Sequence, residues 1–317
     1  MAHHEPPDAS LAPRYTGIKT FARCPYVPDE LDRVDLAVVG VPFDTATSMR
    51  PGPRFGPEAI RSVSVMLRPY NPAQQTQVFG ELSVVDRGDV QVTPGNAEKT
   101  TAQIAAALEP VVRAGVRTLA LGGDHSIVLG ELRAHAAVHG PLGLVLLDAH
   151  ADLWDQYYGE RYFHGTPFLR ALEEGLLDPS RSFLAGMRGS LYGPGDVGLP
   201  ASHGFETIDT DELVSLIPAE YGARVRARVG TGPLFFSFDI DVLDPAFAPG
   251  TGTPEAGGLS TREALRFVRA LAGLDFTGFD VVEVSPPYDG PGQPTAVAAA
   301  NVAYEMLTLA AIARRPG

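Results

Sequence analysis

Three acidic clusters each follow directly after a short apolar run, and this repetition is the feature that most constrains the fold. The clusters cover residues 122–126 (GGDHS), 148–152 (DAHAD) and 239–244 (DIDVLD), and the apolar runs before them cover 118–121, 144–147 and 234–238. Short continuous apolar runs bounded by Gly or Pro are typical of strands buried on both faces. In open α/β sheets the carboxyl ends of the strands open onto the ligand crevice. We therefore expect the polar residues of all three clusters to meet at one edge of a sheet.

The spacing within the clusters predicts a metal site. Six residues are candidate ligands: His125, Asp148, His150, Asp152, Asp239 and Asp241. Residues at positions i, i+2 and i+4 of an extended segment point to the same side, so alternate residues of 148–152 share one side, as do residues 239 and 241. Crowded carboxylates repel one another unless cations are present. Four carboxylates and two neutral imidazoles balance the charge of two divalent ions.

The ligand types favour manganese. Hard oxygen ligands suit Mn²⁺ or Mg²⁺, and the imidazoles shift the preference toward Mn²⁺, with Co²⁺ or Zn²⁺ less favoured. Paired ions lower the pKa of water and supply hydroxide near neutral pH, so we predict two Mn²⁺ per chain and metal-assisted hydrolysis. The alternative is structural, because a single Asp-x-Asp after a strand is usually a turn or a helix cap. The threefold recurrence favours the metal site.

Over nearly its whole length the sequence resembles the ureohydrolases, the arginase and agmatinase family of manganese enzymes. The motifs that carry the resemblance are the clusters at 122–126 and 148–152 together with segments 164–168 (HGTPF), 237–245 (SFDIDVLDP), 248–254 (APGTGTP) and 283–289 (EVSPPYD). Segments 50–57 (RPGPRFGP) and 164–168 are similar to the agmatinase-like branch rather than to arginase proper. The resemblance implies an arginase-like, three-layer α/β/α fold with a mostly parallel sheet. It also implies a homo-oligomer, either a trimer or a hexamer.

The resemblance further implies roles for single residues. The six candidate ligands match the family's metal ligands, with residues 148 and 239 in bridging positions and Asp152 also counted as catalytic. Glu283 resembles the carboxylate that orients the substrate guanidinium, and His164 resembles the histidine that relays protons. Both roles have a physical basis, because a carboxylate pairs bidentately with a planar guanidinium and a histidine titrates near neutral pH. The structural alternatives are a surface acid at a strand end and a histidine at a helix start.

The substrate is less well defined by the sequence. Agmatine carries a distal ammonium group, which would favour acids such as Asp155 or Glu160, whereas a guanidino acid carries a carboxylate, which would favour Arg161. Trp154 and the nearby aromatic residues either wall the substrate pocket or pack the loop. We expect agmatine as the substrate, ahead of 4-guanidinobutyrate, 3-guanidinopropionate or a substrate like that of proclavaminate amidinohydrolase. Arginine is the least expected substrate.

Composition excludes several other classes. The net charge of −13 argues against nucleic acid or an anionic membrane as the main partner. No apolar stretch was expected to reach the roughly 18 residues of a membrane helix. Cys24 is the only cysteine, which excludes an internal disulfide and is compatible with a cytoplasmic location. A non-catalytic structural paralogue is disfavoured by the intact ligand set, and a binuclear phosphoesterase by the absence of a phosphate-binding loop near the ligands.

Strand-like and helix-like segments alternate along the chain, as in a parallel sheet with helices on both faces. Besides the three runs above, strands are expected at 35–40, 182–186, 205–209 and 279–283, and helices from 57 and over 96–114, 127–139, 166–174, 264–272 and 295–313. Pro110 is expected to kink or split the second of these helices. Residues 1–13 are predicted to form a flexible N-terminal arm, and 14–317 a single catalytic domain.

Overall fold

The computed structural model describes residues 3–315 and is built around an eight-stranded sheet. The strands, in spatial order, are β4 (Val84–Asp89), β1 (Leu36–Val41), β5 (Arg117–Gly122), β10 (Phe276–Val282), β9 (Leu234–Asp239), β6 (Gly143–Leu147), β7 (Phe183–Met187) and β8 (Glu206–Asp209). Every pair of neighbouring strands in this sheet is parallel. All eight carboxyl ends therefore lie along the same edge.

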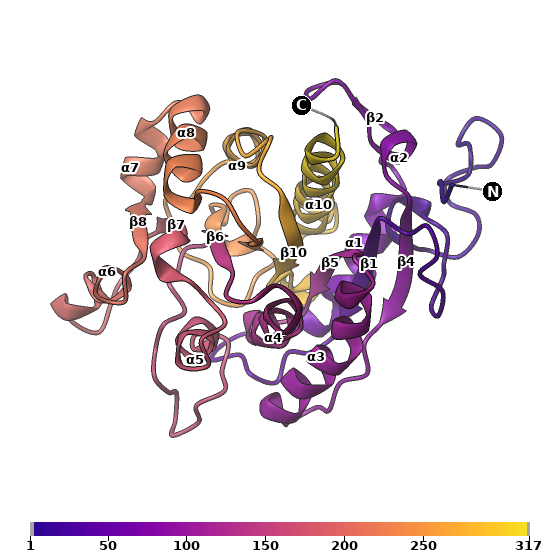
Figure 1. The fold of residues 1–317 in the computed structure, drawn as a ribbon. Coiled ribbons are helices and arrows are strands. Elements are labelled where there is room, and N and C mark those ends of the chain that lie inside the picture. Colours follow the sequence, from indigo (N-terminus) through magenta and orange to yellow (C-terminus); the bar gives the residue numbers. More distant parts are fainter. Residues whose placement is uncertain (1–2, 316–317) are drawn as a thin grey trace.

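Helices cover both faces of the sheet (Figure 1). One layer holds α3 (Ala97–Arg113), α4 (Val128–His139) and α5 (Pro167–Glu173), and the other holds α1 (Gly56–Ser64), α8 (Pro218–Val229), α9 (Thr261–Arg269) and α10 (Pro294–Ala313). Shorter elements are α2 (Val78–Glu81), α6 (Leu199–Ser202), α7 (Thr210–Ser215) and an antiparallel pair of β2 (Tyr70–Asn71) and β3 (Thr76–Gln77). The predicted three-layer α/β/α fold with a parallel sheet is confirmed.

Burial on both faces explains why the central strands are continuous apolar runs. All residues of β1, β6 and β9 are buried. Aromatic residues of β9 divide between the layers: Phe236 and Phe238 pack in the cluster that includes α9 and α10, whereas Phe235 packs in the cluster that includes α4 and α5. Alternation of side chains along a strand has this effect. The central strands are thus held rigidly from both sides, and their carboxyl ends are fixed in space.

Two of the longer elements were not predicted, and one proline does not split its helix as expected. Strand β4 and helix α8 were missed, although α8 begins at Pro218 and the Glu220 carboxylate accepts a hydrogen bond from the backbone N–H of Ile217 (3.1 Å), a common start signal. Helix α3 continues through Pro110 to Arg113 without a split. Pro110 stands in the last turn, where the lost hydrogen bond and the steric clash disturb little of the helix.

Helix α10 corrects the expectation that no stretch is apolar enough to span a membrane. Helix α10 is long and apolar enough to span a membrane, because its most apolar 18 residues have a mean hydropathy of 1.5. However, 78% of this stretch is buried inside the protein. Its buried Glu305 pairs with Arg269 of α9 (2.6 Å). A helix that is apolar all round is expected in the core of an α/β protein. We therefore assign α10 to the core layer that covers the sheet.

The described part of the predicted N-terminal arm contacts the body of the protein. The His3 ring lies 2.7 Å from the backbone oxygen of Phe79, and the backbone N–H of His4 donates to Ser83 Oγ (3.1 Å). Residues 1 and 2 lie outside the described residues. The division into an arm over 1–13 and a catalytic domain over 14–317 stays a prediction.

Candidate metal centre and active site

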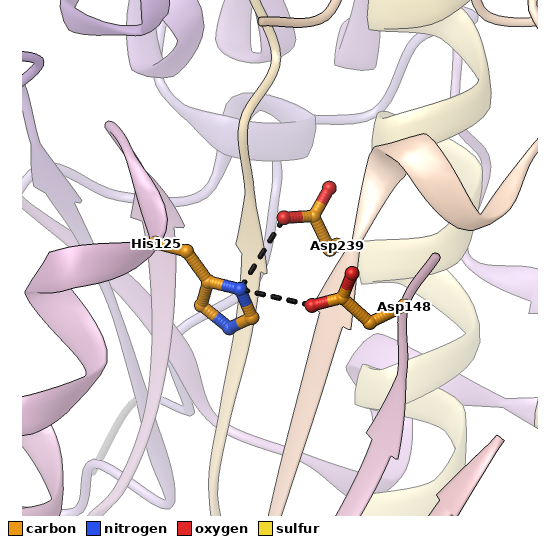
Figure 2. A group of neighbouring side chains, drawn as sticks. All are labelled: His125, Asp148 and Asp239. Carbon is orange, nitrogen blue, oxygen red and sulfur yellow. Dashed lines mark ion pairs between the residues drawn. The ribbon is translucent and has the colours of Figure 1, made fainter. Parts of the chain in front are cut away.

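The candidate ligands follow three of the four central strands. His125 follows β5, Asp239 ends β9 and Asp148 follows β6, while Glu283 follows β10, which lies between β5 and β9. Figure 2 shows the side chains of His125, Asp148 and Asp239 converging from these separate segments. Parallel topology thus brings together residues that are more than 100 positions apart in the chain.

The local structure of the clusters differs from the extended segments that were expected. β6 stops at Leu147, and Asp239 is followed by a single 3₁₀ turn, Ile240–Val242. In each cluster an aspartate side chain accepts a hydrogen bond from the backbone N–H two residues later. The pairs are Asp124 and Ser126 (3.0 Å), Asp148 and His150 (2.7 Å), and Asp239 and Asp241 (2.8 Å). In the second and third clusters these Asx turns, rather than strand alternation, aim residues i and i+2 at the same place, whereas in the first cluster the turn presents the residue between them, His125.

Two site residues have left-handed backbone conformations. Asp152 has φ of 48° and Glu283 has φ of 64°. Non-glycine residues rarely adopt this region, and when they do they often lie at functional sites, where the surrounding structure maintains the strain. The Glu283 backbone is held by its N–H, which donates to the Gly123 carbonyl (2.9 Å).

The inner group consists of His125, Asp148 and Asp239, all buried. His125 Nδ1 lies 3.1 Å from Asp148 Oδ2 and 3.3 Å from Asp239 Oδ2, and Asp152 Oδ2 approaches it to 2.9 Å. On the other side of the ring, His125 Nε2 lies 2.9 Å from Ser237 Oγ. The imidazole is therefore held between a hydroxyl and three carboxylates.

The tautomer of His125 follows from these contacts. Ser237 Oγ donates its hydrogen to Asp280 Oδ1 (2.7 Å), so it accepts from His125 Nε2. In a neutral imidazole Nδ1 then carries a lone pair, which faces three carboxylate oxygens. Burial disfavours a second proton on His125, but its hydrogen bonds with Asp148, Asp152 and Asp239 outweigh burial and raise its pKa well above the ordinary value. The arrangement requires a positive charge at this point, and a divalent cation fits it.

The outer group consists of Asp148, His150 and Asp241, so the two groups share Asp148. His150 Nδ1 lies 3.0 Å from Asp241 Oδ2 and 3.6 Å from Asp148 Oδ1. The His150 side chain is 30% exposed, whereas that of His125 is fully buried, so the outer group faces the solvent. Two clusters of oxygen and imidazole ligands that share one carboxylate are suited to a pair of divalent ions.

Glu283 and His164 form a buried pair beside the inner group. Glu283 Oε1 accepts from the backbone N–H of His125 (2.9 Å) and from His164 Nδ1 (2.9 Å). Its Oε2 is buried and has no hydrogen-bond partner in the part of the chain that the structure describes. His164 Nε2 accepts from the Ser48 backbone N–H (3.0 Å). Burial opposes protonation of His164, but the bond to Glu283 outweighs it and raises its pKa.

A cavity of about 600 Å³ opens from the outer group. His150 and Ser48 line it, whereas His164 and Glu283 are not lining residues. The cavity therefore reaches the outer group directly and the His164–Glu283 pair only through Ser48, which contacts His164 Nε2 (2.7 Å). Its walls are aromatic and acidic. Besides His150, the aromatic and charged lining residues are Trp154, Tyr157, Tyr158, Arg188, Tyr192, Asp196, Asp209, Glu212 and Glu255. The Trp154 ring meets Tyr192 edge-on, with centroids 5.3 Å apart.

Of the residues predicted to contact the distal end of the substrate, only the aromatic one lines the cavity. Trp154 lines the cavity, but Arg161 is not among the lining residues. Arg161 Nη2 instead pairs with Glu173 Oε2 at 2.7 Å, and its side chain is 56% exposed. Asp155 pairs with Arg170 (2.8 Å), and Glu160 is exposed and outside the lining. The structure therefore does not bring these three charged residues to the cavity.

Sequence reasoning missed several residues of the site. Ser48, Glu255, Arg188 and Tyr192 lie in loops that are distant in sequence from the acidic clusters. No local signal marks the first two. Arg188 follows β7 in the same way that the acidic clusters follow their strands, so its place at a strand end can be seen in the sequence, but the sequence assigned it no role.

Comparison with known proteins gives the family. The model of the arginase family matches residues 34–308. The chain belongs to this family, and the fold and site together define a hydrolase of guanidino groups. The family depends on a binuclear metal centre, and the inner and outer groups are positioned to hold one.

Named relatives act on different guanidino compounds. The chain is 46% identical to a guanidinobutyrase of Pseudomonas aeruginosa over 98% of both chains. It is also 46% identical to a mitochondrial agmatinase of Gallus gallus, over 95% of this chain and 88% of the relative. Among solved structures, proclavaminate amidinohydrolase of Streptomyces clavuligerus superimposes with a TM-score of 0.88 at 40% identity, over 96% of this chain and 100% of that one.

Proposed function

We propose that the chain hydrolyses agmatine to urea and putrescine. The observation that carries this proposal is the charge of the cavity. Four acids line it, Asp196, Asp209, Glu212 and Glu255, and of these Glu212 is already paired with Arg224. Its arginine, Arg188, donates to backbone carbonyls and has no bond to a side chain among the described residues. An acidic, aromatic lining attracts a distal ammonium and disfavours a distal carboxylate.

The residues beside the inner group suit a guanidinium. Glu283 Oε1 is held by two donors, so its orientation is fixed, and the unpartnered Oε2 is free to accept a guanidinium N–H. This contact would hold the central carbon of the substrate next to the ligand groups. We infer that His164, whose hydrogen bonds to Ser48 and Glu283 fix its ring, carries a proton to the leaving amine.

We also propose that the two ions are manganese. The inner and outer groups offer carboxylate oxygens and imidazole nitrogens and no sulfur, which suits Mn²⁺. When bound, such ions lower the pKa of water, and this is the chemistry they supply to a hydrolysis. The homo-oligomeric state and the cytoplasmic location stay predictions from the sequence.

A second candidate substrate is a guanidino acid such as 4-guanidinobutyrate. The supporting observation is the 46% identity to guanidinobutyrase over nearly the whole length of both chains. Arg161 would have to leave Glu173 to reach a substrate carboxylate, and that ion pair is exposed enough to contribute little to stability. The sequence prediction of a carboxylate clamp therefore stays open as a property of this second candidate.

Urea release by the Mn²⁺-loaded protein separates the candidates. We expect a higher kcat/KM for agmatine than for 4-guanidinobutyrate. We also expect Arg161→Ala to leave agmatine hydrolysis unchanged. A preference for 4-guanidinobutyrate that is lost in Arg161→Ala would replace the first proposal with the second. Absence of urea from both substrates would contradict both.

A further inference from the structure

Arg188 makes an unusual set of contacts for a side chain on a cavity wall. Within residues 3–315 its guanidinium donates only to backbone carbonyls, and these belong to three segments: Gly186 in β7, residues 241–243 after β9, and residues 255–256. The shortest bonds run from Nη2 to the Asp241 carbonyl (2.7 Å) and to the Glu255 carbonyl (2.7 Å). One side chain thus joins three chain segments at the sheet edge.

Both non-shared ligands of the outer group lie in or beside these segments. Asp241 is itself an outer ligand, and its carbonyl is one of the two shortest contacts of Arg188. Glu255 approaches the other ligand, because its Oε1 lies 3.9 Å from His150 Nε2, on the opposite side of the ring from the ligating Nδ1. Histidine ligands are commonly oriented by a carboxylate on the second ring nitrogen.

Neighbouring glycines make room for these contacts. A Cβ added at Gly258 would collide with Arg188 Nη2, and one added at Gly189 would collide with the Glu255 carboxyl group. Burial lowers the pKa of Arg188 and the nearby Asp241 and Asp148 oppose this shift, but a guanidinium stays protonated in proteins. The fixed positive charge therefore remains beside the outer group throughout the working pH range.

We propose that Arg188 is a positioning residue that holds the outer group, but not the inner group, in its metal-binding geometry. The inference rests on the proposed metal centre. Arg188 has no hydrogen bond to the inner ligands His125 and Asp239 within the described residues. His125 is oriented by Ser237 and Asp280 instead. Arg188 acts through the backbone of Asp241 and through Glu255, and touches no reacting atom.

The test is metal retention by Arg188→Lys, which keeps the charge but replaces the five-donor planar fork by a single ammonium with three donors. Wild-type and variant proteins are loaded with Mn²⁺, dialysed at a series of free Mn²⁺ concentrations and analysed for metal content. We expect wild type to hold two ions per chain and the variant to lose one of them, with about 10- to 100-fold weaker retention. In crystals of the variant the remaining ion should lie at His125 and Asp239.

Matched variants separate positioning from general destabilisation. Arg181 also donates to backbone carbonyls, those of Val229 (3.0 Å) and Pro233 (3.2 Å), at the opposite edge of the sheet. Arg181→Lys should hold both ions like wild type. Glu255→Ala removes only the carboxylate beside His150 and should weaken the same ion as Arg188→Lys, and it serves as the second test if Arg188→Lys does not fold.

Three outcomes would overturn the assignment. Arg188→Lys could hold both ions with wild-type affinity, or it could lose both ions together, or Arg181→Lys could weaken retention as much as Arg188→Lys does. If Arg188→Lys does not fold, unchanged retention in Glu255→Ala would have the same meaning. Wild-type protein that holds fewer than two ions would instead overturn the proposed metal centre, and that control distinguishes the two failures.

Discussion

The inner and outer groups share Asp148 but are built differently. The inner His125 is fully buried and oriented by side chains, through Ser237 to Asp280, whereas the outer His150 is 30% exposed and faces the cavity. The outer Asp241 is tied by its backbone to Arg188. The inner ligand His125 is thus supported by side chains of the sheet strands themselves. The outer group faces the substrate cavity and is supported by Arg188 on the cavity wall. The two groups should therefore respond separately to mutation.

Removing Asp148, the ligand that both groups share, should weaken metal binding in the inner and outer groups alike. Asp148→Ala takes a carboxylate from both, so we expect the loss of both ions and of urea release, with affinity falling by more than the roughly 100-fold typical of changes outside the ligand shell. Metal analysis and urea assays check this. Retention of one ion with near wild-type affinity would show that Asp148 serves only one group.

Substrate binding should be separable from both groups. Glu283→Gln keeps the shape of the side chain but removes the charge that pairs with a guanidinium, so we expect kcat/KM to fall by roughly 100-fold, equivalent to about 3 kcal/mol. Metal content should stay at two ions per chain. A loss of metal in this variant would mean that Glu283 supports the inner group through the His125 backbone rather than the substrate.

Ser237→Ala is the counterpart of Arg188→Lys on the inner side. It removes the hydroxyl that accepts from His125 Nε2, so we expect about 10- to 100-fold weaker retention of one ion, this time the inner one. Crystals of the variant should keep the ion at His150 and Asp241. Loss of the outer ion instead would contradict the separate supports.

The buried region behind the inner group predicts a dependence of stability on pH. Burial, and then the nearby His139, lower the pKa of His135 from 6.5 to about 3. Below pH 6.5 the unfolded chain binds a proton that the folded chain excludes, so the folded state loses stability as pH falls, by about 2 kcal/mol at pH 5.

His135→Gln should remove this part of the pH dependence while it preserves a polar partner for Thr118, which lies 2.8 Å from His135 Nε2. Chemical denaturation of metal-free wild type and variant at pH 7 and pH 5 measures the effect. Equal losses of stability in both proteins would show that His135 is accessible to protons in the folded state.

Much of the fold was predictable because its signals are local. Apolar runs of the central strands, buried on both faces, and the capping box at Ser260 mark their elements directly. Strand β4 was missed because its second half, Arg87–Asp89, is polar and partly exposed at the edge of the sheet. Membrane-like hydropathy in α10 was missed because its apolar residues are mostly small alanines.

The site was predictable only where chemistry and sequence pattern coincide. The six candidate ligands repeat behind similar strands, and five of them make up the inner and outer groups, while Asp152 lies against His125. Their turns could not be anticipated, because an Asx turn and a strand both bring residues i and i+2 to one side. Arg188 stands at a strand end, but its partners are backbone carbonyls, which leave no residue type in the sequence to identify them. Glu255 approaches His150 from a separate loop, so no residue spacing reveals it.

The most direct test of this account is an anomalous-difference map from crystals of the Mn²⁺-loaded wild-type protein. We expect two manganese peaks per chain, one bounded by His125, Asp148 and Asp239 and the other by Asp148, His150 and Asp241. A single peak, or peaks that do not share Asp148, would contradict it.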